Sequence, residues 1–353
     1  MAFSSGYFKT SYAKDLTIVE TKPRWVALLL LLAALVVLPF LASTFFLDLA
    51  NQVLLALIGS VALMILTGYA GQISLGHAGL IAAGAFTTAI LFKELQAPFF
   101  ITFPASAVTG GLLGIIFGLP SLRLKGLYLA LSTLSLHFIV TFFGSEYETK
   151  RGLASGVVLD PPSIGTLRLE DPRFWYFFLL IVDVLVVLLA INLIRSRTGR
   201  AWIAVRVRDI AAESFGINVS YYKVLAFVVS SVLTSLAGCL LAYYRGFVSV
   251  EAFSMLMTIE YMAMIIIGGL GSILGAILGT GFVVLLPYAI DALVNIFAIP
   301  SRLTTYMFAI KYASFGLVMI IFLILEPSGL AGIWRRLRDY FILWPFKHKP
   351  VGK

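Results

Sequence analysis

Long apolar runs dominate this chain of 353 residues and limit what it can fold into. A helix needs about 20 mostly apolar residues to cross a membrane. Ten such runs can be placed, some of them short or broken, at 25–46, 52–69, 78–95, 99–119, 127–143, 174–194, 224–244, 258–267 with its glycine-rich continuation, 273–290 and 306–325. A membrane β-barrel is excluded, because its strands give short alternating segments. We therefore predict an all-α integral membrane protein with about ten transmembrane helices and a transmembrane domain over residues 25–326.

The charged residues indicate how these helices are oriented. Only 12% of the chain is charged, about half the share typical of a soluble domain. If residues 1–24 form a cytoplasmic segment and ten spans follow, most of the 26 lysines and arginines fall on the cytoplasmic side, as the positive-inside rule requires. Both termini are then cytoplasmic, and the net charge of +9 leaves no basic patch to assign to nucleic acid.

Three polar segments connect or follow the predicted helices. The external loop, 144–173, should be ordered with short helical or turn pieces, because Asp160-Pro161-Pro162 prevents a continuous helix. A second segment, 195–223, is cytoplasmic. The tail, 327–353, is basic and contains Trp334 and Trp344, a composition typical of an anchor at the lipid headgroups. A regulatory role is the alternative for the tail.

The cytoplasmic segment is predicted to contain one short, capped helix. Asp209 is a good N-cap, 210–215 reads as the helix, and Gly216 stands where a C′ glycine ends it. Ala211 and Ala212 give the helix a small face that another surface could approach closely. Two interpretations stay open: a helix that a partner pushes, or a plain surface loop stabilised by its caps.

The stretch "YAGQISLGHAGLIAAGAF", residues 69–86, interrupts one apolar run. The glycines that allow a break are Gly71, Gly76 and Gly79, and the polar side chains at it are Gln72, Ser74 and His77. These side chains either satisfy the backbone groups that the break frees, which are costly to leave unpaired in lipid, or contact a zwitterionic solute in a translocation path.

A second interruption lies in "IIIGGLGSILGAILGTGF". Gly268 and Gly269 are expected to unwind the backbone, which is tolerated at membrane depth only against protein or a watery cavity. Gly271, Gly275 and Gly279 recur every four residues and should line one face of a helix that packs closely on another.

Few residues offer chemistry of their own. Asp183 and Glu260 are ionisable groups within or at the edge of predicted spans, hence functional candidates; for Asp183 the alternative is a polar contact between helices. The sequence has no P-loop, no nucleophile elbow and no cluster with metal-ligand spacing. We expect no enzymatic activity, cofactor or metal, and any energy for active transport must come from elsewhere.

Four motifs together resemble one family. In order, they are "TGYAGQISLGHAGLIAAGAF", "LPSLRLKGLYLALSTLSL", "TGRAWIAVRVRDIAAESFGINVSYYKVLAF" and "TIEYMAMIIIGGLGSILGAILG". They resemble the LivM-type permease subunit of branched-chain amino acid ABC importers, from about Gly59 to Pro287 and more loosely to Leu325. The predicted short helix is similar to the coupling motif of such permeases, whose Ala-Ala-x-x-x-Gly core begins at Ala211. Ile210 replaces the leading glutamate, and Glu213 follows instead.

The resemblance implies an assembly and a location. The partners would be a LivH-type permease in a heterodimer, two cytoplasmic ABC ATPases, a periplasmic solute-binding protein and membrane lipid. ATP binding and hydrolysis would drive alternating access across the bacterial inner membrane. Alternatives are a same-family importer of urea, an amide or a small organic acid, an ion-coupled secondary transporter using Asp183 and Glu260, and a scaffold that transports nothing.

One departure from the family pattern concerns the external loop. Where relatives tend to have a Thr-Gly-Gly-type turn, this chain has "TKRGLASG". Lys150 and Arg151 would either alter docking of the binding protein or attract an anionic substrate.

Overall fold

A computed structural model describes residues 22–153, 156–164, 167–168, 171–296, 307–326 and 328–343. Residues 1–21 of the predicted N-terminal segment, and the end of the tail with Trp344, lie outside these ranges.

The described chain is almost wholly helical. Its helices are α2 (Lys22–Leu41), α3 (Thr44–Leu63), the π-helix η1 (Met64–Tyr69), α4 (His77–Leu95), α5 (Phe99–Gly118), η2 (Pro120–Leu122), α6 (Leu127–Lys150), α7 (Pro172–Arg195), α8 (Arg197–Val207), α9 (Asp209–Ser214), α10 (Val219–Arg245), η3 (Val250–Ala252), α11 (Met255–Gly268), α12 (Ile273–Ile296), α14 (Met307–Leu325) and α15 (Gly329–Leu343). The strands are β1 (Val157–Val158), β2 (Ser163–Ile164), β3 (Leu167–Arg168) and β4 (Phe247–Val248).

The predicted fold class, an all-α membrane protein, is confirmed. Eight helices of the described part are long and apolar enough to cross a membrane, so "about ten" was approximate. The first and last predicted runs are also helical, as α2 and α14, but are not among the eight. The run 25–46 is not one span, because α2 ends at Leu41 and α3 begins at Thr44.

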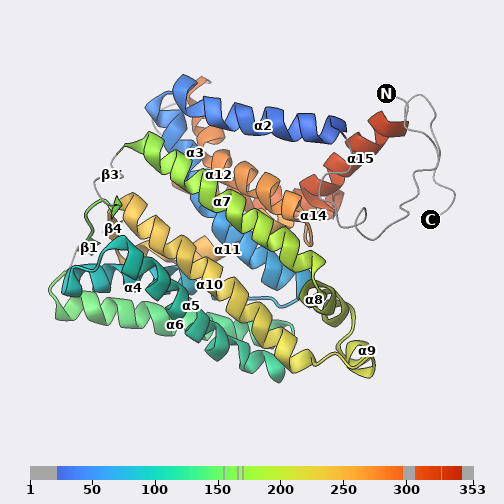
Figure 1. Cartoon of the computed structure of the whole chain (residues 1–353), viewed down its shortest axis with the longest axis horizontal. Coiled ribbons are helices and arrows are strands. Elements are labelled where there is room, and N and C mark those ends of the chain that lie inside the picture. Colours follow the sequence, from blue (N-terminus) through green and yellow to red (C-terminus); the bar gives the residue numbers. More distant parts are fainter. Residues whose placement is uncertain are drawn as a thin grey trace.

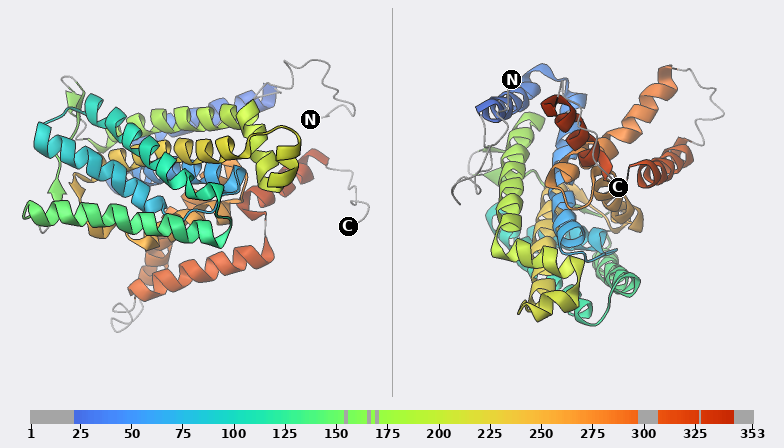
Figure 2. Two further views of the ribbon diagram at one scale, coloured as in Figure 1. Left: turned by 90° about the horizontal axis from the view of Figure 1, so that it is seen from below. Right: turned by 90° about the vertical axis from the view of Figure 1, so that its right-hand side faces the viewer.

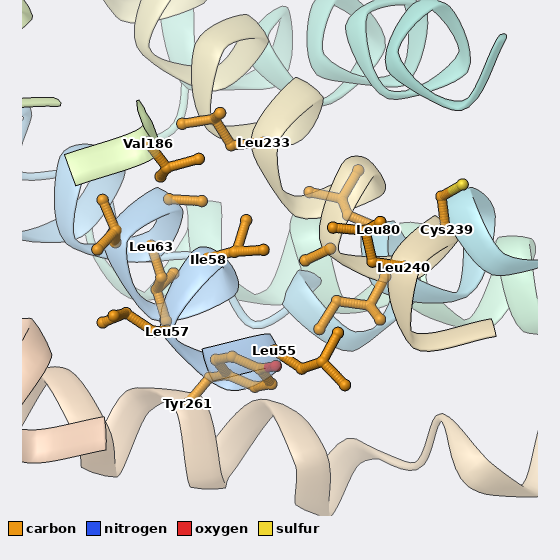
Figure 3. Close-up of a cluster of buried hydrophobic side chains, with 14 of the residues drawn as sticks. Leu55, Leu57, Ile58, Leu63, Leu80, Val186, Leu233, Cys239, Leu240 and Tyr261 are labelled. Atoms are coloured by element: carbon orange, nitrogen blue, oxygen red, sulfur yellow. The ribbon is translucent and has the colours of Figure 1, made fainter. Parts of the chain in front are cut away.

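The long helices run back and forth between two ends of a bundle (Figures 1 and 2). One end carries β1 and β4 and is called the strand end below. The other carries α8 and α9 and is called the α9 end; α2 begins and α15 ends on that side of the molecule (Figure 1). The centre is α10, which packs on α3, α4 and α5. Figure 3 shows Leu233 and Leu240 of α10 beside Ile58 of α3 and Leu80 of α4.

Small residues allow these helices to pack closely. A Cβ on Gly114 of α5 would lie 2.7 Å from the Cα of Val228 in α10. Ser230 Oγ of α10 donates to the carbonyl of Ala62 at 2.8 Å, and Ser106 Oγ of α5 donates to the carbonyl of Ser235 at 2.8 Å. Close backbones and such interhelical hydrogen bonds are typical of membrane helices, which gain little from the hydrophobic effect among themselves.

The predicted external loop differs from expectation in its ends and its content. α6 continues to Lys150, so the non-helical segment starts later than residue 144. Its described residues contain a turn at 151–152, as one of the predicted kinds of piece, and short strands that were not predicted: β1 pairs antiparallel with β4, and β2 with β3. Asp171 ends the segment as N-cap of α7, accepting a hydrogen bond from the Arg173 amide at 2.9 Å.

The described part of the tail forms an amphipathic helix, α15. Trp334 and Leu337 are exposed together with Arg335 and Arg338, while Arg336 pairs with Glu326 at 2.7 Å. This pattern suits an interface between water and headgroups, and the anchor stays a prediction.

Candidate functional site

The first predicted break is present at the α9 end. The π-helix η1 ends at Tyr69, residues 70–76 are not helical, and α4 begins at His77. Gly71 has φ +70°, a conformation that favours glycine. The amide of Gln72 still reaches back to the carbonyl of Leu66 at 3.1 Å, so the chain leaves the helix in one wide turn.

The polar residues at this break mainly hold backbone. Gln72 Nε2 donates to the carbonyl of Lys223 at 3.1 Å, and the hydroxyl of Thr67 donates to the carbonyl of Gln72 at 3.0 Å. Ser74 Oγ accepts from the amide of Gly76 at 3.3 Å. Gln72 Oε1 and His77 Nε2 are buried with no hydrogen-bond partner within the described ranges. Both predicted interpretations therefore keep a physical basis.

His77 lies deep among helices. Its ring centroid is 4.7 Å from that of Tyr261 in α11. Side chains from other helices bind the backbone on either side of it: Thr133 accepts from the amide of Leu75 at 2.9 Å, and Thr258 accepts from the amide of Ala78 at 3.0 Å. His77 is 1% exposed and lines neither polar cavity described below.

The second break separates α11 from α12. α11 ends at Gly268 and Gly269 has φ +112°, so the backbone unwinds where the sequence predicted. Gly271 was misplaced by the predicted four-residue pattern: it lies in the turn before α12, with φ +82°, and not on the helix face. Gly275 and Gly279 do lie on α12 and face α11. A Cβ on Gly275 would stand 2.7 Å from the carbonyl oxygen of Gly268.

The two breaks meet at Arg206 of α8. Its guanidinium donates to the carbonyl of Gly68, beside the first break. A Cβ on Gly71 would lie 2.8 Å from Cγ of Arg206, and one on Gly271 would lie 2.8 Å from its Nη1. The amide of Gly271 also reaches Sδ of Met64 in η1 at 3.2 Å. The sequence predicted both breaks but not this contact.

The predicted short helix is α9, and its end is as expected. Gly216 has φ +78°; its amide donates to the carbonyl of Glu213 at 2.9 Å, and the amide of Ile217 donates to that of Ala212 at 3.1 Å. This pair of bonds is a Schellman motif. The predicted N-cap was wrong, because Arg208 precedes the helix and Asp209 is its first residue.

Asp209 anchors the helix instead of capping it. Its Oδ2 lies 2.8 Å from Nζ of Lys125 and 2.8 Å from Nζ of Lys223. Burial alone would raise the pKa of the Asp209 carboxyl, but the hydrogen bonds from Lys125 and Lys223 outweigh it and hold that pKa below its ordinary value. The backbone carbonyl of Lys223 also accepts a hydrogen bond from the Gln72 side chain. Lys223 therefore connects Asp209 of α9 to the first break.

The surface that α9 presents is apolar. Ile210 is 78% exposed and Phe215 87% exposed, with Ala211 and Glu213 exposed between them. Ala212 is 3% exposed, because its side chain packs against the rest of the protein. The small face predicted for both alanines is therefore offered by Ala211 alone, and the two large apolar side chains dominate.

A cavity of about 650 Å³ opens at the strand end between α3, α10, α11 and α12. Its polar and charged lining residues are Asp48, Gln52, Tyr244, Arg245, Glu260, Tyr261, Tyr288 and Asp291. Tyr244 donates to Asp48, Gln52 Nε2 donates to Asp48 at 2.8 Å, and Tyr288 donates to Gln52 Oε1 at 2.9 Å. Of these polar and charged lining residues, the sequence predicted only Glu260 as a functional candidate.

The other predicted ionisable residue lies elsewhere. Asp183 of α7 is 2% exposed, and neither carboxyl oxygen has a hydrogen-bond partner in the described part of the chain. It does not line the strand-end cavity, so the structure does not bring Asp183 and Glu260 together. The polar interhelical contact considered for Asp183 is not formed with any described residue.

The two unusual cations of the external loop have partners. Lys150 pairs with Glu146 at 3.0 Å, and Arg151 pairs with Glu94 at 2.5 Å. Neither charge is left unpaired to attract an anionic solute.

Comparison with known proteins gives consistent matches. The family "Branched-chain amino acid transport system / permease component" matches residues 45–324. The high-affinity branched-chain amino acid transport system permease protein LivM of Escherichia coli (strain K12) is 29% identical over 290 residues, 75% of this chain and 68% of the relative. LivM of Salmonella typhimurium is 28% identical over 275 residues, 71% of this chain and 65% of the relative.

A relative with a different named cargo also matches. The autoinducer 2 import system permease protein LsrC of Klebsiella pneumoniae is 30% identical over 203 residues, 54% of this chain and 55% of the relative. The chain thus spans about two thirds of the LivM relatives and about half of LsrC. No solved structure matches this chain significantly.

Proposed function

Because this chain belongs to the branched-chain amino acid transport system permease family, we propose that it is the LivM-type membrane subunit of an ATP-driven importer for branched-chain amino acids or similar small solutes. Two cytoplasmic ABC ATPase subunits would hydrolyse ATP, since this sequence contains no P-loop. A LivH-type permease would complete the membrane unit as a heterodimer, and a periplasmic solute-binding protein would deliver the cargo. The assembly would lie in the bacterial inner membrane.

The observation that carries this proposal is the α9 end. A rigidly ended helix exposes Ile210 and Phe215, while Asp209 and Lys223 tie its buried side to Gln72 at the first break. Arg206, from the helix just before, contacts both breaks. A displacement of α9 by an ATPase would therefore reach the two interrupted helices directly. A plain surface loop would not need these connections.

The orientation follows from the same assignment. If α9 meets ATPases, the α9 end is cytoplasmic, and the described starts and ends of the chain on that side agree with cytoplasmic termini. The strand end would then face the periplasm and receive the binding protein. Lys150 and Arg151 would contribute to that surface as paired residues.

At the first break we assign backbone support to Ser74 and His77, with Gly71 and Gly76 permitting the turn. Gln72 has the same role but keeps Oε1 without a described partner, beside a cavity of about 150 Å³ that Arg206 and Asp209 also line. Solute contact therefore stays open for Gln72.

The test is uptake by the reconstituted complex. The chain, its LivH-type partner, ATPases and binding protein are co-expressed, purified and placed in proteoliposomes, and labelled leucine, isoleucine and valine are offered with and without internal ATP. We expect uptake that requires both ATP and the binding protein. Uptake driven by an ion gradient without ATP would instead support a secondary transporter.

The similarity to LsrC favours a second candidate, an importer of the same architecture for another small solute. Calorimetric titration of the purified binding protein with amino acids, urea, amides and small organic acids separates the two candidates.

A further inference from the structure

We propose that the strand-end cavity is a binding site for a zwitterionic amino acid, in which Arg245 takes the carboxylate and Glu260 the ammonium group. This inference rests on the proposed function and adds a site within the membrane subunit to it. The cavity holds about 650 Å³, within the range of about 300–1,000 Å³ common for small-molecule sites.

Arg245 and Glu260 place two opposite charges in the lining of this cavity. Arg245 and Glu260 line the same cavity and interact electrostatically, yet neither forms an ion pair or hydrogen bond with any residue in the described ranges. An α-amino acid carries one charge of each sign a few ångströms apart. Two opposite charges that line one cavity and have no hydrogen-bonded partner in the described ranges match that arrangement.

The neighbouring acid of the cavity, Asp48, contrasts with Glu260. Its two carboxyl oxygens are occupied by Tyr244 and Gln52, and Gln52 is held in turn by Tyr288. This network fixes one wall without offering a free charge. A half-buried carboxylate without a hydrogen-bonded partner in the described ranges, such as Glu260, carries a desolvation cost that a ligand ammonium would offset.

The charged and apolar groups of the cavity follow an order with depth from the strand end. Arg245 is the last residue of α10, at the strand end, and is exposed. Glu260 lies five residues into α11 and is half-buried. The apolar lining residues include Leu55, Met257, Met264, Val283 and Pro287. An amino acid entering from the strand end would meet a cation first, an acid deeper, and an apolar wall for its side chain.

The experiment uses the full reconstituted complex with its binding protein. Glu260→Gln and Arg245→Gln remove one charge each. We expect the initial rate of leucine uptake to fall at least tenfold in each variant, while assembly and binding-protein-stimulated ATPase stay within twofold of wild type. Glu251→Gln and Arg173→Gln are matched controls, because both residues are exposed outside the cavity, and both should transport normally.

A third variant tests the space without touching a charge. Met257→Trp fills the cavity and should also lower uptake at least tenfold. If either charge variant fails to assemble, this variant tests the binding site in its place. Uptake within twofold of wild type in the assembled variants overturns the site. A proportional loss of stimulated ATPase also overturns it, because that result assigns the charges to docking of the binding protein. Absence of amino acid uptake by the wild-type complex overturns the proposed function itself.

Discussion

Two charged residues of the strand-end cavity and those at the α9 end are used in opposite ways. At the α9 end, Asp209 is bound by two lysines and Arg206 is bound to the backbone of a broken helix. In the cavity, Arg245 and Glu260 are left without bonded partners in the described chain. Under the two proposals above, one end would move as a connected unit, whereas the other would keep its charge available for a ligand.

The close contact between α11 and α12 should be the most sensitive element of the fold. Gly275→Leu forces a side chain into the 2.7 Å approach between α12 and the carbonyl of Gly268. We expect a loss of about 3 kcal/mol of stability, or no assembled complex at all. Gly281→Leu is the control on the same helix, since a Cβ there meets nothing within 4 Å. Size-exclusion chromatography and thermal unfolding compare the two; equal behaviour would contradict the packing.

At the α9 end, Arg206→Leu should remove the hydrogen bond by which α8 contacts the first break, and its charged contact with the second. The carbonyl of Gly68 loses a charge-assisted donor, which costs about 1.5–3 kcal/mol. We expect uptake to fall at least tenfold while ATP hydrolysis persists. Arg197→Leu, which removes an exposed cation from the start of α8, serves as control. Normal uptake by Arg206→Leu would mean that this end does not act as a unit.

Gly216→Val tests the end of α9 itself. A β-branched residue at φ +78° is strained by roughly 1–2 kcal/mol, and the Schellman motif should be lost. The variant should remain in the membrane but lose stimulation of ATPase by loaded binding protein. Gly216→Asn, which tolerates this backbone conformation, should keep most of it. Wild-type stimulation in the valine variant would contradict a coupling role for α9.

The smallest effect concerns acid. Because the pKa of Asp209 is lower in the folded protein, its ion pairs contribute stability above the unfolded pKa of about 3.9. That contribution is lost as pH falls through the lower folded pKa. Since Lys125 is exposed, we expect about 1 kcal/mol or less. Thermal unfolding from pH 3 to 6 should show a shallower acid dependence in Asp209→Asn than in wild type; identical slopes would mean that the pairs contribute nothing.

Local chemistry explains which features could be predicted from the sequence. Apolar runs predicted the helices, and Gly216 predicted the end of α9, because both depend on neighbours in the chain. The two breaks were predicted from glycine and polar residues inside apolar runs. Gly271 was misplaced, because its four-residue spacing from Gly275 crosses the turn before α12.

Contacts between distant segments could not be predicted in the same way. Arg206 and Gly68 are 138 residues apart, and Asp48 and Tyr244 are 196 apart. Asp209 looks like an N-cap in the local sequence, and only folding brings Lys125 to it. The polar lining residues of the cavity come from four helices that are far apart in the chain, so no local pattern predicts that they meet.

The wider winding of the π-helix η1 bears on the length of the first broken helix. In the six residues Met64–Tyr69, backbone hydrogen bonds join residues i and i+5, whereas an α-helix joins residues i and i+4. Rewinding this turn as α-helix would pass one residue, or about 1.5 Å of rise, into the chain that leads to Gly71 and α4. Such a change would replace i→i+5 backbone hydrogen bonds with i→i+4 bonds. The chain next to Arg206 would then lengthen by one residue, with α3 and α4 each keeping its own internal register.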